Sequence, residues 1–254
     1  MNVTILQHDI VWANPAENRK RIEAMLKQQP ASDLYVLTEM WATGFAIQPQ
    51  GVAETLPSSS LEWMKGMATT LNAAIAGSLA IEEGGRYYNR FYFVKPDGSF
   101  ASYDKRHLFT FGGEQEQYAK GAERKIVEWR GVRFLLQVCY DLRFPVWSRN
   151  QGGYDAVLYV ANWPVPRIEA WNTLLRARAI ENQCYVVGVN RVGEDPKCQY
   201  NGWSAIIDPY GRTIAAPPTG TEQGATAEID MERLNAFRAK FPVLNDADQF
   251  KLVD

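Results

Sequence analysis

The sequence contains little histidine and little cysteine. Its 254 residues include two histidines and three cysteines. The cysteines Cys139, Cys184 and Cys198 form no CxxC pair, so neither a common zinc site nor a disulfide framework is indicated, and free thiols are expected. With only His8 and His107 present, a cysteine–histidine catalytic pair has few possible partners.

The sequence also has no large excess of positive or negative charge and no long apolar run. The formal net charge is −2, with 27 basic and 29 acidic residues, and no basic cluster suggests nucleic acid or an anionic membrane surface. No segment approaches the ~18 apolar residues of a membrane span, and the N-terminus does not resemble a secretion signal. The proportions of 46% hydrophobic and 22% charged residues are those of a folded globular protein. From the balanced charge and the missing signal and span, we expect a cytoplasmic protein that binds neither nucleic acid nor membranes.

Strand-like and helix-like segments alternate along the chain. The residue patterns predict helices over 14–29, 59–72 and 167–182, the first with Asn14 as N-cap and the second with Ser59. Apolar runs predict the strands 3–7, 33–40, 74–81, 132–139, 154–162 and 184–190. The alternation indicates one α/β fold rather than separate α and β domains.

Two turns predict hairpins between further strands. Pro96, Asp97 and Gly98 combine a fixed proline φ with a glycine that accepts positive φ, and residues 206–215 repeat this arrangement. The number of strands favours two sheets. No Gly/Ser-rich linker divides the chain, so we expect a single domain over 1–254, in which 231–254 form a C-terminal helix and a polar tail that reaches a neighbouring subunit.

Cys139 ends an apolar strand and is followed at once by a charged, proline-ended turn. A thiolate is the nucleophilic form of cysteine, and its pKa falls near helix N-termini and cations, so a helix beginning after Pro145 favours a lowered pKa. A buried strand end is an equally good interpretation of Cys139 alone. We expect Cys184 to be a core residue and Cys198 an exposed loop thiol.

Several side chains could serve as a base or an electrophile beside a thiol. Glu39 closes an apolar strand, where a partly desolvated carboxylate can act as a general base, although a salt bridge or a cap would explain it too. Lys105 follows the predicted hairpin and Glu114 lies in a glycine-rich loop, and solvent exposure is the ordinary state of both. His8 and His107 are expected to be structural, with His107 as a minor alternative base.

Taken together, the segments around Glu39, Lys105 and Cys139 resemble the nitrilase superfamily of carbon–nitrogen hydrolases, and within it the bacterial omega-amidases. The similar segments, in order, are LTEMWATGF, YDKRHLF, CYDLRFP, YVANWP, RARAIENQCYVVGVNRVG and GWSAIIDPYGRTIA. They extend over nearly the whole chain. One position departs from the superfamily pattern, because Thr38 stands before the glutamate where proline is common.

The resemblance implies a four-layer αββα sandwich, with two packed mixed sheets flanked by helices, and a homodimer formed through a helical face. The stripe Ile168, Trp171, Leu174 and Leu175 suits either the core or that interface. The resemblance also implies that no metal or organic cofactor is needed, because a thiol, a carboxylate and an ammonium group supply the nucleophile, the base and the electrophile.

The implied catalytic residues are Glu39, Lys105 and Cys139. In this mechanism Glu39 takes the thiol proton, Cys139 attacks an amide carbonyl to form a thioester, and Lys105 holds the oxyanion together with the backbone N–H of Tyr140. Glu114 matches the second glutamate of the superfamily better than Glu116 does, and it would orient Lys105 or the substrate.

The implied substrates are small omega-amido 2-oxo acids such as 2-oxoglutaramate and 2-oxosuccinamate. Their carboxylate suits the fork of Arg143, which could alternatively pair with Asp141 or cap the next helix. Trp163 would wall the pocket or else belong to the core or an interface. The alternatives are an amidase for deaminated glutathione, an N-carbamoyl amine or a nitrile, and a non-catalytic small-molecule-binding protein of the same fold.

Overall fold

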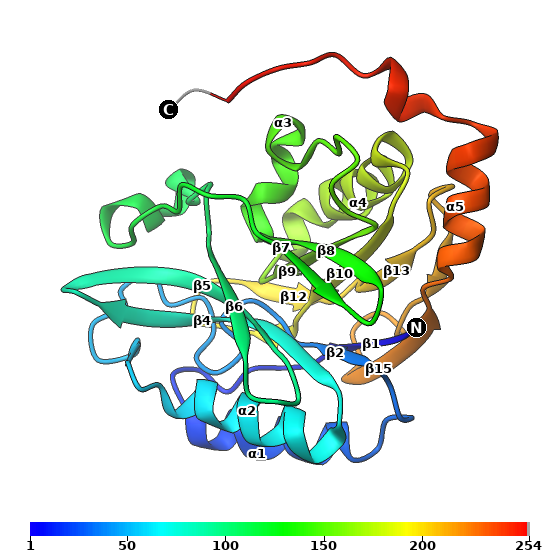
Figure 1. The fold of residues 1–254 in the computed structure, drawn as a ribbon. Helices are drawn as coiled ribbons and strands as arrows, with labels where there is room; N and C mark the ends of the chain where they lie inside the picture. The colour runs from blue at the N-terminus through cyan, green and yellow to red at the C-terminus, as the bar shows by residue number, and fades with distance from the viewer. Residues whose placement is uncertain (253–254) are drawn as a thin grey trace.

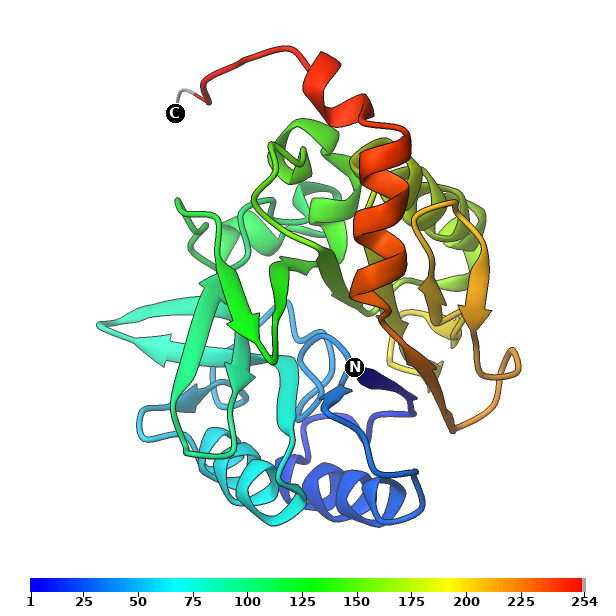
Figure 2. The same ribbon diagram turned by 45° about the vertical axis from the view of Figure 1, so that its right-hand side comes forward.

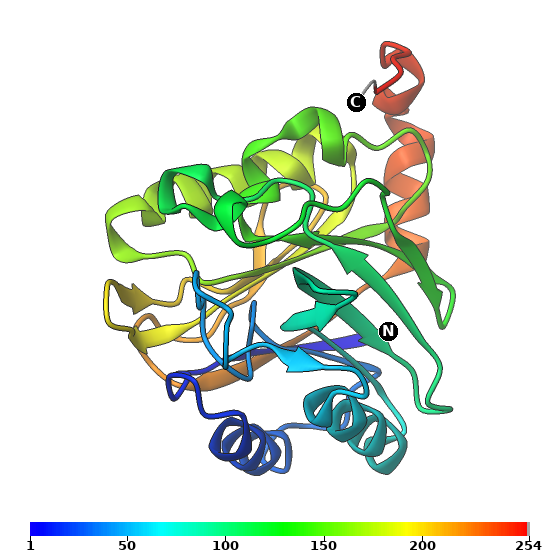
Figure 3. The ribbon, with the colours of Figure 1, turned by 90° about the vertical axis from the view of Figure 1, so that its left-hand side faces the viewer.

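The computed structural model describes residues 1–252 and arranges them in four layers, helix, sheet, sheet and helix (Figure 1). Figures 1 and 3 show one helical layer beneath the lower sheet and another above the upper sheet. The helices are α1 (Pro15–Leu26), α2 (Ser59–Leu71), α3 (Pro145–Ser148), α4 (Ile168–Asn182) and α5 (Met231–Lys240). This is the predicted αββα sandwich; residues 253–254 of the predicted tail lie outside the described part.

Each sheet has a continuous order of strands. In the lower sheet the order is β15-β1-β2-β4-β5-β6, with β3 beside β4, and in the upper sheet it is β14-β13-β10-β9-β8-β7. The lower strands are β1 (Asn2–Gln7), β2 (Leu34–Val36), β3 (Glu54–Thr55), β4 (Ala74–Glu83), β5 (Arg86–Val94), β6 (Phe100–Asp104) and β15 (Gln223–Glu228). The upper strands are β7 (Ile126–Trp129), β8 (Val132–Val138), β9 (Ala156–Ala161), β10 (Tyr185–Asn190), β13 (Ala205–Ile207) and β14 (Thr213–Ala215). A separate hairpin joins β11 (Val192–Glu194) to β12 (Gln199–Asn201).

The central strands are apolar on both faces because both faces are covered. In β8, Phe134 and Leu136 enter the core between the two sheets, whereas Leu135 faces the core beneath α4. The stripe on α4 belongs to that second core, since Trp171 and Leu175 are buried in it. Of the two interpretations left open for this stripe, the structure therefore shows the core.

Most local predictions are confirmed, and one helix cap is corrected. Asn14 caps α1 by accepting from the Glu17 N–H at 3.2 Å. The N-cap of α2 is Ser58 instead of Ser59, because the Ser58 hydroxyl accepts from the Leu61 N–H at 3.1 Å. Three consecutive serines leave this choice open in the sequence, and tertiary contacts with Glu54 decide it. Both predicted hairpins form, β5–β6 and β13–β14.

The first and the last strand of the chain pair in the lower sheet. Strand β15 pairs antiparallel with β1, so Thr4 lies opposite Thr226 with their hydroxyl groups 2.7 Å apart (Figure 2). Helix α5 follows and is anchored by Arg238, which donates to Asp155 at 2.8 Å and to the Gln183 carbonyl at 2.9 Å. The chain after α5 runs along the outside of the upper helical layer (Figure 1). No helix within residues 1–252 is both long and apolar enough to span a membrane.

The strand ends gather the polar residues of interest. Strands β8, β9 and β10 are parallel, and so are β1, β2 and β4. Cys139 directly follows β8, Asn162 follows β9, and Glu39 lies three residues beyond β2. Carboxyl ends of parallel strands are the usual location of sites in open α/β sheets. The topology therefore brings these three residues to one region between the sheets.

Gly121 packs against the strand end that carries Lys105. A Cβ at Gly121 would clash with the Asp104 carbonyl, directly before Lys105, whereas a Cβ at Gly66 in α2 would meet nothing. We predict that Gly121→Ala lowers the free energy of unfolding by about 1–3 kcal/mol through overpacking. The control Gly66→Ala should raise it by roughly 0.5–1 kcal/mol, because glycine is unfavourable inside a helix. Urea denaturation measures both, and an unchanged Gly121→Ala protein would contradict the close contact.

Candidate active site

Cys139 lies at a sharp turn. Its φ is +45°, an uncommon left-handed value for a residue with a side chain, at the junction of β8 and the short 3₁₀ helix Cys139–Arg143. Such conformations cost free energy and persist where the surrounding structure enforces them, frequently at functional sites. The turn leaves Cys139 half-buried at the wall of a cavity.

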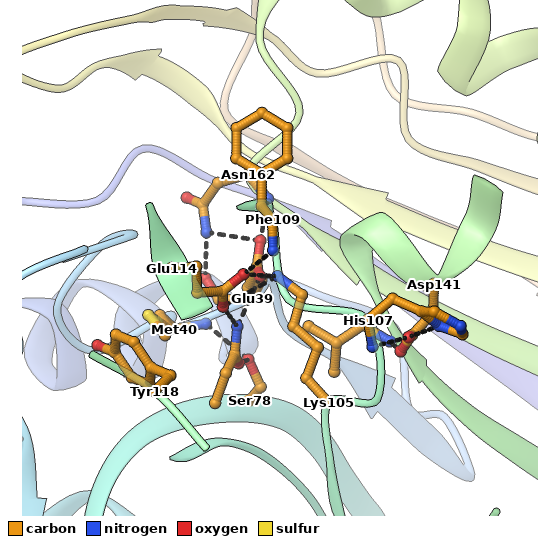
Figure 4. A network of polar contacts seen from close by, with 12 residues as sticks. Glu39, Met40, Ser78, Lys105, His107, Phe109, Glu114, Tyr118, Asp141 and Asn162 are labelled. Carbon is orange, nitrogen blue, oxygen red and sulfur yellow. Dashed lines mark hydrogen bonds and ion pairs between the residues drawn. The ribbon is translucent and has the colours of Figure 1, made fainter. Parts of the chain in front are cut away.

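Lys105 lies buried between two glutamates (Figure 4). Its ammonium group donates to Glu39 at 3.0 Å and to the two carboxylate oxygens of Glu114 at 2.9 and 3.1 Å. Burial alone would lower the pKa of Lys105, but the negative charges of Glu114 and Glu39 outweigh it and raise that pKa. Lys105 is therefore a permanent cation at neutral pH.

Each glutamate is fixed by further hydrogen bonds. Asn89 donates to Glu39 at 2.7 Å, and the backbone N–H of Asn162 donates to the other oxygen of Glu39 at 2.8 Å. The backbone N–H of Phe109 donates to Glu114 at 2.6 Å. Burial raises the pKa of Glu114, and the nearby Lys105 opposes this only in part. The Glu39 carboxylate consequently keeps one orientation, with Lys105 on one side and Asn162 on the other.

The expectation of a lowered thiol pKa is wrong for Cys139. Burial raises the pKa of Cys139 well above its usual value, and the charge of Glu39 together with a hydrogen bond to it raises the pKa further. Lys105 opposes these effects without overcoming them. The helix that was expected to help, α3, begins six residues after Cys139 and has only four residues. The thiol is thus protonated in the free protein and needs a base to become a nucleophile.

Sequence reasoning missed two asparagines of this site. Asn89 donates to both Glu39 and Glu114, at 2.7 and 3.3 Å, and its own oxygen accepts from Ser78 at 2.9 Å. Asn162 also donates its side-chain amide to the Glu39 carbonyl at 2.7 Å. The sequence contains a signal for each asparagine. Asn89 lies within a strand rich in aromatic residues, although asparagine is uncommon in strands, and Asn162 is a polar residue at the end of a buried strand.

Both histidines take part in other networks. The His107 ring stacks on Phe144 with centroids 3.9 Å apart, and its Nδ1 lies 2.8 Å from Asp141. Asp141 also accepts from the backbone N–H of Val138 at 2.9 Å, so it ties the lysine loop to the turn before Cys139. The alternative pairing of Arg143 with Asp141 is therefore wrong: the Asp141 oxygens are used by these groups and by the Tyr103 hydroxyl at 2.8 Å.

His8 is a buried structural residue, as expected. Its ring contacts the Asp9 carbonyl at 3.1 Å and the Thr38 hydroxyl at 3.1 Å. Burial lowers the pKa of His8 to about 4, so the ring is neutral at neutral pH. Thr38, the residue that replaces the common proline, thus gives the segment before Glu39 a side-chain anchor.

A cavity of about 640 Å³ opens in front of Cys139 and Glu39. Arg143 and Trp163 both lie on its wall, with the Arg143 guanidinium 5.0 Å from the centre of the Trp163 ring. Cys184 is fully buried, as predicted, but Cys198 is half-buried on the cavity wall and is not an exposed loop thiol. The β11–β12 hairpin folds over the cavity and places Cys198 there.

Metal-binding groups are not clustered in the described chain. Across residues 1–252, no three histidine, cysteine, aspartate or glutamate side chains are arranged to hold a metal ion. A thiol and a carboxylate, those of Cys139 and Glu39, line the cavity, and the buried ammonium of Lys105 lies 3.0 Å from that carboxylate. They can supply a nucleophile, a proton acceptor and a fixed positive charge for a developing oxyanion.

Comparisons with known proteins identify the family of this chain. The carbon–nitrogen hydrolase family matches residues 2–239. The chain is 46% identical to omega-amidase YafV of Yersinia enterocolitica, covering 100% of this chain and 99% of that protein. It is 36% identical to 2-oxoglutaramate amidase of Bacillus subtilis, covering 96% of each.

A solved structure shows the same fold. XC1258 from Xanthomonas campestris, a CN-hydrolase superfamily protein, superposes with a TM-score of 0.96 at 42% identity, covering 100% of this chain and 99% of that one. The resemblance seen in the sequence is confirmed. A full-length relative and a family match over nearly the whole chain establish that this protein belongs to the carbon–nitrogen hydrolase family of the nitrilase superfamily.

Proposed function

We propose that the protein is an omega-amidase that releases ammonia from the terminal amide of small omega-amido 2-oxo acids, such as 2-oxoglutaramate. The observation that carries this proposal is the group of Glu39, Lys105 and Cys139: Glu39 and Cys139 line a cavity that also has arginines on its wall, and the buried Lys105 ammonium pairs with Glu39 at 3.0 Å. The 46% identity to an omega-amidase over the full chain supports the same activity and substrate class.

Acylation begins with the protonated thiol. Glu39 accepts the proton of Cys139, and the resulting thiolate attacks the amide carbon to form a tetrahedral oxyanion. The Lys105 ammonium and the backbone N–H of Tyr140, the residue after the nucleophile, stabilise that oxyanion. Glu39 then returns the proton to the amide nitrogen, the carbon–nitrogen bond breaks, and ammonia leaves a thioester on Cys139.

Deacylation reverses the proton transfers with water as the nucleophile. Glu39 takes a proton from water, the hydroxide attacks the thioester, and the same two groups stabilise the second oxyanion. The proton returns to the Cys139 sulfur as the carbon–sulfur bond breaks, which releases the carboxylic acid. Lys105 exchanges no proton, because its raised pKa keeps it charged throughout.

Glu114 acts as a positioning residue for Lys105. It contributes two of the three hydrogen bonds that hold the ammonium, and the Phe109 N–H fixes its own carboxylate. Glu116, the other glutamate of the same loop, is exposed. Substrate binding is assigned to Arg143, which would hold the carboxylate, and to Trp163, whose buried ring supports the Arg143 guanidinium.

We also propose that the chain works as a single cytoplasmic domain and assembles into a homodimer. Exposed apolar side chains lie along the upper helical layer and the chain after α5, where Ile180 is 55% and Phe241 57% exposed. An interface across this layer would cover them. A mass in solution equal to one chain would refute this assembly.

The first test is ammonia release from 2-oxoglutaramate. We predict that the wild type releases ammonia and that Cys139→Ala abolishes it, because no thioester can form. Cys198→Ala is the control, since it removes the other thiol on the cavity wall and should leave turnover unchanged. Activity retained by Cys139→Ala would refute the mechanism, whereas turnover of only an N-carbamoyl amine, a nitrile or another amide would refute the substrate.

The thiol should respond to the charge of Glu39. Glu39→Gln removes the negative charge that raises the pKa of Cys139 but leaves Lys105 in place, so the thiolate fraction at neutral pH should rise. We predict faster alkylation of Cys139 by iodoacetamide in Glu39→Gln, with its pH profile shifted to lower pH, while amide hydrolysis is lost with the base. Glu116→Gln should keep the wild-type profile, and a Glu39→Gln profile shifted to higher pH would contradict the assignment.

Removing the charge of Glu114 should lower turnover more than substrate binding. We predict that Glu114→Gln lowers kcat by about 10²–10³, similar to the loss of an oxyanion donor, with KM nearly unchanged. The matched control Glu116→Gln should be indistinguishable from wild type, and circular dichroism should show both variants folded. A rise in KM at unchanged kcat would instead assign Glu114 to substrate binding.

A further inference from the structure

The wall of the active-site cavity carries a second arginine besides Arg143. Arg167 ends the short 3₁₀ helix Val165–Arg167, and its guanidinium lies 5.2 Å from the centre of the Phe109 ring. The Arg143 guanidinium lies 5.0 Å from the Trp163 ring centre in the same way. All four side chains line the cavity that contains Cys139. Two guanidinium groups on aromatic faces therefore border the place where a substrate would lie.

Neither guanidinium has an acidic partner. Within the described residues 1–252, no hydrogen bond or ion pair involves the guanidinium of Arg143 or Arg167. Arg133, Arg191 and Arg238, in contrast, all form ion pairs with aspartates at 2.6–2.8 Å. An aromatic face holds a guanidinium in position but leaves its charge and its in-plane donors available.

Trp163 connects the two arginines. Its ring lies beneath Arg143, and its indole N–H donates to the carbonyl of Arg167 at 2.7 Å. The backbone N–H of Trp163 is held by Asn190 at 2.7 Å, and the Trp163 side chain is 3% exposed. The guanidinium of Arg143 and the backbone of Arg167 thus both contact one buried residue.

The acids of the cavity do not neutralise these cations. Glu39 faces Lys105. The Asp195 carboxylate accepts from the backbone N–H groups of Lys197 and Cys198, at 2.7 and 2.8 Å, and from the Tyr200 hydroxyl at 2.6 Å. The other charged side chains of the wall, Arg143, Arg167 and Lys197, are all positive, and positive charge at a cavity raises the local concentration of anions.

We propose that Arg167 is a specificity-determining residue that binds the 2-oxo acid end of the substrate together with Arg143. This inference rests on the proposed amidase function. A carboxylate matches the fork of one guanidinium, and the adjacent ketone adds an acceptor in the same plane, which requires a second donor group. Two arginines on a common support therefore select a 2-oxo acid over an amide with a plain carboxylate or with none.

Three substrates and one matched control test the proposal. The substrates are 2-oxoglutaramate, glutaramate, which lacks the ketone, and butyramide, which lacks the ketone and the carboxylate. The variants are Arg167→Met and Arg212→Met. Arg212 is the control because its guanidinium also lies over an aromatic ring, 5.2 Å from the Tyr210 centre, but outside the cavity.

For Arg167→Met we expect kcat/KM to fall about 10- to 100-fold for 2-oxoglutaramate, mainly through KM, as for a lost hydrogen bond to a charged group. The loss should be smaller for glutaramate and absent for butyramide, and Arg212→Met should match wild type on all three. An equal loss on all three substrates would overturn the proposal, since it would indicate a structural effect through Trp163. Unchanged kinetics would overturn it too.

A binding measurement separates this proposal from the proposed function. Calorimetric titration of 2-oxoglutarate into Cys139→Ala protein requires no turnover. If the wild type hydrolyses no oxo-amide but 2-oxoglutarate binds and Arg167→Met weakens that binding, the two-arginine site stands and the catalytic assignment fails. If 2-oxoglutarate binds equally with and without Arg167, or does not bind, the site is refuted whatever the enzyme hydrolyses.

Discussion

The ammonium group of Lys105 sets the requirements for the rest of the site. A charge buried this deeply is unfavourable unless it is paired and hydrogen-bonded, and here two carboxylates supply the compensation. Two carboxylates around one lysine need donors of their own, which Asn89, Asn162 and the Phe109 backbone provide. The groups that stabilise this one cation therefore come from both sheets, since Asn89 lies on β5 and Asn162 follows β9. Because each of these charged groups is held by several hydrogen bonds, the site is rigid.

The same arrangement separates two tasks that a single histidine often combines. In the proposed mechanism Lys105 keeps its charge throughout, and Glu39 is the group that accepts and returns a proton. Cys139 stays protonated, because burial and the negative charge of Glu39 both disfavour the thiolate. A protonated thiol is a poor target for oxidants and stray electrophiles. In the proposed mechanism the nucleophile is therefore generated when Glu39 takes the thiol proton.

Features with a local signature could be predicted from the sequence. The Asn14 cap, both hairpins, the apolar strands and the segments around Glu39, Lys105 and Cys139 are all encoded within short stretches. Features that arise from contacts between distant parts of the chain could not be predicted in this way. Asn162 meets Glu39 across 123 residues, and Cys198 reaches the cavity only because its hairpin folds over it. The pKa of Cys139 was predicted with the wrong sign because desolvation depends on tertiary burial, which a motif does not reveal.

The pairing of β1 with β15 has a consequence for folding during translation. Thr4 and its partner Thr226 are 222 residues apart, so β1 leaves the ribosome long before the strand that covers its outer edge exists. At ordinary synthesis rates the interval is roughly 11–45 s. During that time β1 can pair only with β2, and its other edge stays open to unwanted partners. The lower sheet is therefore completed only after β15 has been synthesised.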